Sequence, residues 1–183
     1  MKIVIGITGA SGSLFGVEFV KMCGGDKYLI ASRWGKSVLA QETGLKLSDL
    51  APHVKKVFSD EDLSSPLASG SNPIDAMVIL PCTASTLAKI ACGIADSLLT
   101  RAAAVTLKER RKLILCVRET PLSTITLEQM LKLSQAGALV MPMCPSFYQG
   151  ALTIKKQAQL FGKRVCQLLE PNTQTTGWKQ ENL

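Results

Sequence analysis

Three short stretches combine hydroxyl groups, exposed backbone and charge in a way that suits an anionic ligand. The first is GITGASGSLFG, residues 6–16, which holds four glycines together with Thr8, Ser11 and Ser13. Bare backbone with hydroxyls beside its amides favours an anion such as a phosphate. The stretch has neither the GxGxxG pattern of dinucleotide-binding loops nor the GKS/T ending of a P-loop, which disfavours a nicotinamide cofactor and ATP. Tight packing of a strand against a helix is the alternative explanation.

The second and third stretches are PCTAST, residues 81–86, and RETP, residues 118–121. The hydroxyls of PCTAST precede a predicted helix, where Ser and Thr often act only as N-caps. Arg118 can clamp a phosphate through two hydrogen bonds, and Glu119 can transfer protons. A surface Arg–Glu ion pair is the alternative for these two residues. If the three stretches converge, their amides, helix dipoles and charge together favour a phosphate.

Short apolar segments alternate with helical patterns along the chain, which predicts an α/β fold with a central parallel sheet. The predicted strands are 2–7, 28–31, 54–58, 75–80, 113–117 and 138–141, and Pro81 is expected to end the fourth. The predicted helices are 12–23, 33–43, 85–91, 95–109, 127–135 and 153–169, with a loop or short helix at 64–71. All three polar stretches follow strands, so they are expected at the carboxyl edge of the sheet, where such folds bind ligands.

Composition limits the classes of function. A chain of 183 residues, 46% hydrophobic and without repeats or linkers, fits one domain over residues 1–170 followed by a polar tail, 171–183. The net charge is +7 and basic residues cluster at 108–112, but aromatic residues make up only 5% and no nucleic-acid-binding motif is present. Small anionic ligands explain the positive charge equally well. Because the chain has few aromatic residues and no nucleic-acid-binding motif, we expect no nucleic-acid partner.

Cysteine and histidine usage argues against a metal centre. The six cysteines form no CxxC pair, which favours buried reduced thiols, and His53 has no second histidine with which to share a metal or a catalytic triad. No apolar run reaches the roughly eighteen residues that a membrane span needs, and no signal-peptide pattern begins the chain. A cytoplasmic protein without metal is the expectation.

Four longer segments carry a family resemblance. GITGASG, MVILPCTAST, DSLLTRAAAVTLKERRKLILCVRETP and MPMCPSFY resemble, in order and spacing, the UbiX-type flavin prenyltransferases of the homo-oligomeric flavin-containing cysteine decarboxylase superfamily. The resemblance covers about residues 1 to 170, and the long third segment is its specific part. It implies a Rossmann-like (flavodoxin-like) three-layer sandwich. It also implies transfer of a dimethylallyl group from dimethylallyl phosphate to N5 and C6 of reduced FMN, without a metal, in a homododecamer. The prenylated FMN would then serve a UbiD-type decarboxylase in ubiquinone biosynthesis or aromatic acid decarboxylation.

The resemblance also assigns roles to individual residues. The residues matching the FMN-binding positions are Gly9, Ala10, Ser11, Ser32, Thr83, Ala84, Ser85, Thr86 and Arg118. Those matching the prenyl-phosphate positions are Lys108, Tyr148 and Arg164, and Trp178 of the tail is a candidate lid over the prenyl site. The catalytic candidates are Glu119, Ser11 and Glu42, with Glu119 as the acid/base.

Some features depart from the family pattern or leave alternatives open. Glu18 stands where relatives carry arginine, and the 83–86 loop begins with Thr83 rather than serine. The donor could be the monophosphate or the pyrophosphate. A flavin-dependent decarboxylase would need a histidine near the first helix, which His53 does not provide, and a flavin-binding protein without turnover is the third possibility. The alanine-rich segment 95–105 is the expected subunit contact.

Overall fold

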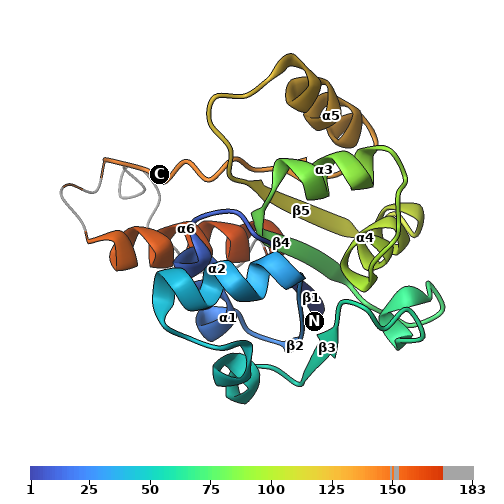
Figure 1. Ribbon diagram of the computed structural model, residues 1–183, viewed down its shortest axis with the longest axis horizontal. Helices are drawn as coiled ribbons and strands as arrows, with labels where there is room; N and C mark the ends of the chain where they lie inside the picture. Colours follow the sequence, from blue (N-terminus) through green and yellow to red (C-terminus); the bar gives the residue numbers. More distant parts are fainter. Residues whose placement is uncertain (149, 151–152, 171–183) are drawn as a thin grey trace.

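One six-stranded parallel sheet lies at the centre of the computed structural model, which describes residues 1–148, 150 and 153–170 (Figure 1). The strands are β1 (Lys2–Ile7), β2 (Asp26–Ala31), β3 (Lys56–Ser59), β4 (Ala76–Cys82), β5 (Lys112–Val117) and β6 (Leu139–Val140). They follow the order β3-β2-β1-β4-β5-β6, and neighbouring strands pair in parallel. The chain reverses its direction of winding between β1 and β4, and such a switch point opens a crevice beyond the carboxyl ends of the strands.

Helices cover both faces of the sheet. They are α1 (Ser13–Met22), α2 (Arg33–Thr43), α3 (Ala84–Ala91), α4 (Leu98–Lys108), α5 (Thr124–Gln135) and α6 (Ile154–Leu169), with short 3-10 turns η1 (Leu47–His53) and η2 (Pro66–Ala68). Along β1, Ile3 and Ile5 pack under α1, α2 and α6, while Val4 joins the core under α3 and α4. Alternate strand residues point to opposite faces, so a sheet covered on both sides needs strands that are apolar throughout. The predicted three-layer α/β sandwich is confirmed.

The long helix α6 packs along α1. The rings of Phe15 and Phe161 meet edge to face, with centroids 5.6 Å apart. Two turns further along α1, Met22 reaches α6: a Cβ placed on Gly162 would lie 2.9 Å from the Met22 Sδ. Gly162 therefore allows the two helices to approach closely.

Two features of the fold differ from the sequence-based expectations. Pro81 does not end β4, which continues to Cys82 through a shift in register between Ile79 and Cys82. The backbone still pairs there because the Arg118 amide donates to the Cys82 carbonyl at 3.0 Å, a bond that needs no N–H from proline. The turn η1, which buries Leu50, had no periodic signal in the sequence.

A further expectation concerns the alanine-rich segment 95–105. Its apolar residues Leu98, Ala102 and Ala103 lie on the inner face of α4 and are buried against the sheet of the same chain. The sheet of the same chain therefore already uses this apolar face, and contact of the segment with a neighbouring subunit through its other residues stays a prediction.

Candidate active site

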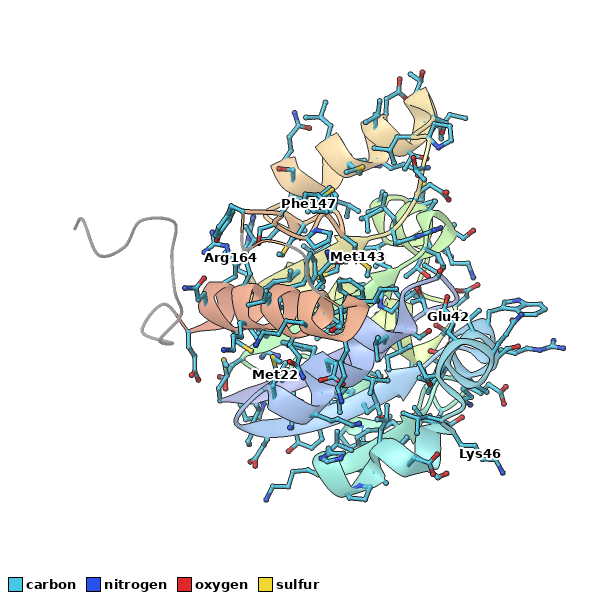
Figure 2. All side chains as sticks on the ribbon, turned by 90° about the vertical axis from the view of Figure 1, so that its left-hand side faces the viewer. Met22, Glu42, Lys46, Met143, Phe147 and Arg164 are labelled. Atoms are coloured by element: carbon cyan, nitrogen blue, oxygen red, sulfur yellow. The ribbon has the colours of Figure 1, made fainter. Side chains whose placement is uncertain are left out.

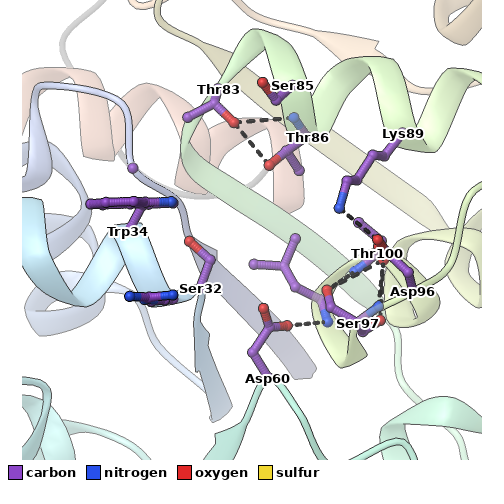
Figure 3. A pocket seen from close by; sticks show the side chains of 13 residues that line it. Ser32, Trp34, Asp60, Thr83, Ser85, Thr86, Lys89, Asp96, Ser97 and Thr100 are labelled. Atoms are coloured by element: carbon purple, nitrogen blue, oxygen red, sulfur yellow. Dashed lines mark hydrogen bonds and ion pairs between the residues drawn. The ribbon is translucent and has the colours of Figure 1, made fainter.

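A pocket of about 380 Å³ opens at the carboxyl edge of the sheet, where the sequence predicted a ligand site (Figure 3). Each of the strands β1 to β4 is followed by residues that line it. The lining residues are Gly9, Ser32, Arg33, Trp34, Asp60, Thr83, Ser85, Thr86, Lys89, Asp96, Ser97, Leu99 and Thr100. Its volume falls in the range of roughly 300–1,000 Å³ that is usual for small-molecule sites.

Two helix N-termini border this pocket. Ser32 caps α2 by accepting a hydrogen bond from the Gly35 amide at 3.0 Å, and Thr83 caps α3 by accepting one from the Thr86 amide at 3.1 Å. The capping role suggested as the alternative is thus confirmed for Thr83. The first amides of each helix have no partner within that helix, and the helix dipoles place partial positive charge there. Capping and anion binding are compatible, because a helix N-terminus offers several amides.

Thr8 holds the first two polar stretches together instead of facing a ligand. This residue is buried, its hydroxyl donates to the Pro81 carbonyl at 2.7 Å, and the Thr83 amide donates to the same hydroxyl at 2.9 Å. The ends of β1 and β4 are therefore fixed side by side, as convergence of the two stretches requires.

A carboxylate from α2 accepts hydrogen bonds from the backbone amides of the loop after Gly9. Gly12, in the left-handed region with φ of 101°, begins α1 without a side-chain cap. Glu42, from the last turn of α2, supplies that cap: its Oε2 accepts hydrogen bonds from the Gly12 amide at 2.9 Å and the Ser13 amide at 2.8 Å. The structure therefore brings the two catalytic candidates Glu42 and Ser11 to the same loop.

The surroundings of Glu42 keep it ionised. Burial alone would raise the pKa of this carboxyl, but hydrogen bonds from the Ser11 side chain and from the Ser13 and Gly12 amides outweigh it and lower the pKa below its ordinary value. Glu42 is consequently a charged group at neutral pH, suited to hold the loop or to accept a proton.

The end of β5 brings Arg118 and Glu119 to the same edge of the sheet. The bond between the Arg118 amide and the Cys82 carbonyl places them next to the Thr83 loop, and both side chains are exposed. Glu119 accepts a hydrogen bond from the Thr120 amide at 3.0 Å, and within the described part of the chain no ion pair joins it to Arg118. The alternative of a simple Arg–Glu pair is therefore not what the structure contains.

The candidate phosphate residues do not gather at the pocket within one chain. Lys108 ends α4 shortly before β5 begins at Lys112, so it lies at the amino edge of the sheet, where it pairs with Glu109. Arg164 lies on the exposed side of α6 and donates to Gln167 of the same helix at 3.0 Å (Figure 2). Tyr148 is half exposed in the segment after β6. Trp178 lies outside the described residues. A role for Lys108 at this pocket requires a second copy of the chain.

Sequence reasoning missed Trp34. Its side chain is 67% exposed on the first turn of α2, and the Arg33 guanidinium lies 5.6 Å from its ring centroid, within cation–π range. A Cβ on Gly9 would lie 2.6 Å from the Trp34 Cβ, so Gly9 is required for this loop to pass the tryptophan. Its position in the sequence could have identified it, because Trp34 closely follows the end of a predicted strand, as the three polar stretches do.

The sequence also did not predict the wall of the pocket that Asp60, Lys89 and Asp96 form. Asp60, after β3, accepts a hydrogen bond from the Leu99 amide at 2.8 Å and so caps α4 (Figure 3). Lys89 and Asp96 form an ion pair at 2.7 Å, and their hydrogen bond lowers the pKa of Asp96. These acidic groups make this wall less suited to a phosphate than the edge formed by Ser32 and Thr83.

Other groups that could indicate a different chemistry lie elsewhere. Among the described residues, no cluster of three or more His, Cys, Asp or Glu side chains could hold a metal ion. His53 belongs to η1, which connects the end of α2 to the start of β3 and so lies at the amino edge, away from the pocket. In the same part of the chain, no helix is long and apolar enough to cross a membrane.

Comparisons with known proteins show the family to which the chain belongs. The family model described as Flavoprotein matches residues 1–160. The flavin prenyltransferase UbiX of Thermoplasma acidophilum is 42% identical over 170 residues, covering 92% of this chain and 94% of the relative. A probable UbiX-like flavin prenyltransferase of Bacillus subtilis is 42% identical over 151 residues, covering 81% of this chain and 74% of the relative. The chain belongs to the UbiX flavin prenyltransferase family.

Solved structures place this family member among flavoproteins of known architecture. A crystal structure of AnUbiX (PadA1) in complex with FMN and dimethylallyl pyrophosphate superposes with a TM-score of 0.92 at 34% identity, covering 97% of this chain and 98% of that one. A dodecameric FMN-dependent Ubix-like decarboxylase from Escherichia coli O157:H7 gives a TM-score of 0.90 at 37% identity, covering 96% and 100%. The FMN-dependent cysteine decarboxylase TvaF, at 21% identity and a TM-score of 0.65, shares the fold alone.

Proposed function

We propose that this chain is a metal-independent flavin prenyltransferase, which transfers a dimethylallyl group from dimethylallyl phosphate to N5 and C6 of reduced FMN. The observation that carries the proposal is the carboxyl-edge pocket, bordered by two capped helix N-termini, in a chain that shares 34% identity with a protein crystallised with FMN and dimethylallyl pyrophosphate. The proposed domain spans residues 1–170, with 171–183 as a tail.

The residues of the pocket fit FMN. Hydroxyl groups beside the open amides of α2 and α3 suit the FMN phosphate. They belong to Ser32, Thr83, Ser85 and Thr86. Gly9 and Trp34 line the pocket side by side, so a flat ring can lie there against the main chain of Gly9 and the indole of Trp34. With Ala10, Ser11, Ala84 and Arg118, these residues form the proposed FMN site. Reduced FMN would supply an electron-rich ring whose N5 and C6 accept the prenyl group.

The side chains of the protein would handle the charge and the protons of the reaction. Breaking the bond between the allylic carbon and the phosphate leaves negative charge on the phosphate, which Arg118, Lys108 and Arg164 would stabilise while Tyr148 donates a hydrogen bond. Glu119, exposed beside the Thr83 loop, would take the proton that leaves C6 and return one to the phosphate. Glu42 would stay ionised and keep the Ser11 loop in place.

Assembly completes the proposed site. Since Lys108 lies at the amino edge of its own chain, we propose that a neighbouring subunit supplies it in a homododecamer. The exposed face of α5, with Ile125, Leu127 and Leu131 from 50% to 66% exposed, is the surface at which we expect copies of the chain to meet. The dodecameric relative from Escherichia coli supports this assembly. We further propose that the product serves a UbiD-type decarboxylase and that the protein is cytoplasmic, as its six unpaired cysteines favour.

The direct test is to incubate the purified chain with reduced FMN and dimethylallyl phosphate under anaerobic conditions. A flavin heavier by one prenyl group, with a changed absorbance spectrum, is the expected product, and a parallel reaction with dimethylallyl pyrophosphate identifies the preferred donor. Recovery of unchanged FMN with both donors would refute the proposal.

One observation supports a second candidate, flavin-dependent decarboxylation, because the Escherichia coli relative at 37% identity is described as a decarboxylase. Release of carbon dioxide from a cysteine-ended peptide, with FMN left unmodified, would favour that activity. Tight FMN binding with neither product would favour a flavin-binding protein without turnover.

A further inference from the structure

A second, smaller cavity lies at the opposite edge of the sheet from the proposed active site. It measures about 140 Å³ and lies where the end of α1 meets the end of α6. Its lining residues are Met1, Met22, Cys23, Gly24, Cys166, Leu169 and Glu170. Because α1 begins at the Ser11 loop and runs to the amino edge, the length of this helix separates the cavity from the pocket that we assign to FMN.

Close packing of the two helices brings the thiols of Cys23 and Cys166 to this cavity. Met22, which precedes Cys23, lies directly beside α6 (Figure 2), against Gly162, one helical turn before Cys166. The Cys23 amide donates to the Phe19 carbonyl at 2.9 Å, which fixes the backbone of Cys23 at the end of α1. Cys23 is almost completely buried, with 4% exposed, whereas Cys166 is only partly buried.

The interaction between the two thiols shifts their pKa values in opposite directions. The interaction between the two side chains is the largest cause of both shifts: it lowers the pKa of Cys166 and raises that of Cys23. The Cys23 thiol also donates to the Gly24 carbonyl at 3.6 Å. The Lys27 ammonium lowers the pKa of both thiols, while Glu170 opposes it. A partly exposed thiol with a lowered pKa beside a buried thiol is the usual arrangement of an attacking and a resolving cysteine.

We propose that Cys166 and Cys23 form a redox dithiol, which reacts with small disulfides of the glutathione type and closes to a disulfide that links α1 to α6. In the first step the Cys166 thiolate attacks oxidised glutathione, a Cys166–glutathione disulfide forms, and one glutathione thiolate leaves. In the second step Cys23 gives up its proton and attacks the Cys166 sulfur, and the second glutathione leaves as a thiolate that takes up that proton. Two protein thiols are oxidised and one glutathione disulfide is reduced to two thiols.

The second step becomes possible because the first one changes the environment of Cys23. The interaction with the Cys166 side chain and the charge of that residue are two of the causes that raise the pKa of Cys23. Once Cys166 is in a mixed disulfide, it carries no charge, and these two effects disappear. Burial and Glu170 then oppose ionisation, and Lys27 continues to favour it.

The test uses the full-length chain with oxidised glutathione as the probe, followed by alkylation of the remaining thiols, digestion and mass spectrometry. The native protein should give a peptide linking Cys23 to Cys166, two hydrogen masses lighter than the separate peptides. Cys23→Ser should stop at the first step and carry glutathione on Cys166. Cys166→Ser should give neither product at these positions.

Cys92→Ser serves as the matched control, because Cys92 is exposed on the other side of the sheet, after α3. This variant should form the Cys23–Cys166 link as the native protein does, and reduction with excess thiol should reverse the link. Glutathione on the exposed Cys92 and Cys144 of the native protein, with Cys23 and Cys166 still alkylated as free thiols, would overturn the proposal. So would a link that forms no faster in the folded protein than in urea.

Discussion

Replacing Glu42 with alanine should loosen the start of α1 and the loop that carries Ser11. The amides of Gly12 and Ser13 donate to this one carboxylate at 2.9 and 2.8 Å, and Gly12 provides no side-chain cap of its own. In Glu42→Ala both amides lose their partner. In Glu42→Gln one uncharged oxygen can still accept a hydrogen bond, so the loss should be smaller.

The size of the effect follows from these contacts. Loss of a helix cap costs about 0.5–2 kcal/mol, and the attraction between a carboxylate and a helix N-terminus is worth about 0.3–1 kcal/mol at an exposed position. Because Glu42 is exposed, we use the lower part of both ranges and expect Glu42→Ala to lose about 1 kcal/mol of unfolding free energy. In a protein of this size, about 1 kcal/mol corresponds to a fall in Tm of about 2–4 °C.

The pH dependence separates the charge from the rest of the side chain. The pKa of Glu42 is lower in the folded protein, so its ionised form contributes stability in full above the pKa of the unfolded chain. That contribution is lost as the pH falls through the folded pKa. The deficit of Glu42→Gln relative to the native protein should therefore be largest at neutral pH and shrink at acidic pH, below the ordinary glutamate pKa of about 4.3.

Thermal unfolding followed by circular dichroism, at one fixed protein concentration, measures these differences. Glu61→Ala and Glu61→Gln are matched controls, because Glu61 is exposed in the turn after β3, away from the start of α1. If the Glu42 variants unfold at the same temperature as the Glu61 variants, Glu42 does not cap α1. A Glu42→Gln deficit that stays constant down to acidic pH would show that charge has no part in the capping.

Three further predictions test the proposed site. Arg118→Ala should bind FMN about 10–150-fold more weakly, from the roughly 1.5–3 kcal/mol of a charged hydrogen bond. The control Lys46→Ala, at an exposed position between α2 and η1, should keep its flavin. A full flavin content in Arg118→Ala would reject the assignment. Glu119→Gln should bind FMN almost normally but turn over about 10²–10⁴-fold more slowly, and normal turnover would exclude it as the acid/base. Lys108→Ala and Glu119→Gln should each have little activity alone but recover activity when the two variants are assembled together. In the mixed assembly, some sites combine an intact Lys108 from one chain with an intact Glu119 from another. If activity does not recover, a neighbouring subunit does not supply Lys108.

The sequence alone was sufficient for the six strands and six helices, apart from some of their ends and the turn η1, and for the edge at which the site lies. The predicted strand 2–7 and helix 33–43 coincide with β1 and α2, because an apolar run and a helical period are each encoded within a few consecutive residues. The placement of Ser32 and the Thr83 loop at one edge also followed from sequence, since a parallel sheet brings the carboxyl ends of its strands together.

Contacts between distant residues were decided only by the tertiary structure. No local pattern could show that Glu42 would cap α1, that Thr8 would join the ends of β1 and β4, or that Cys23 would meet Cys166. The order of the strands and the packing of helices on them bring these partners together across long stretches of chain. Lys108 illustrates the same limit: the family resemblance assigned it to the prenyl phosphate, but α4 runs back across the sheet and leaves it at the opposite edge. Residue type determines which chemistry is possible, and the path of the chain determines which residues lie close enough together to carry it out.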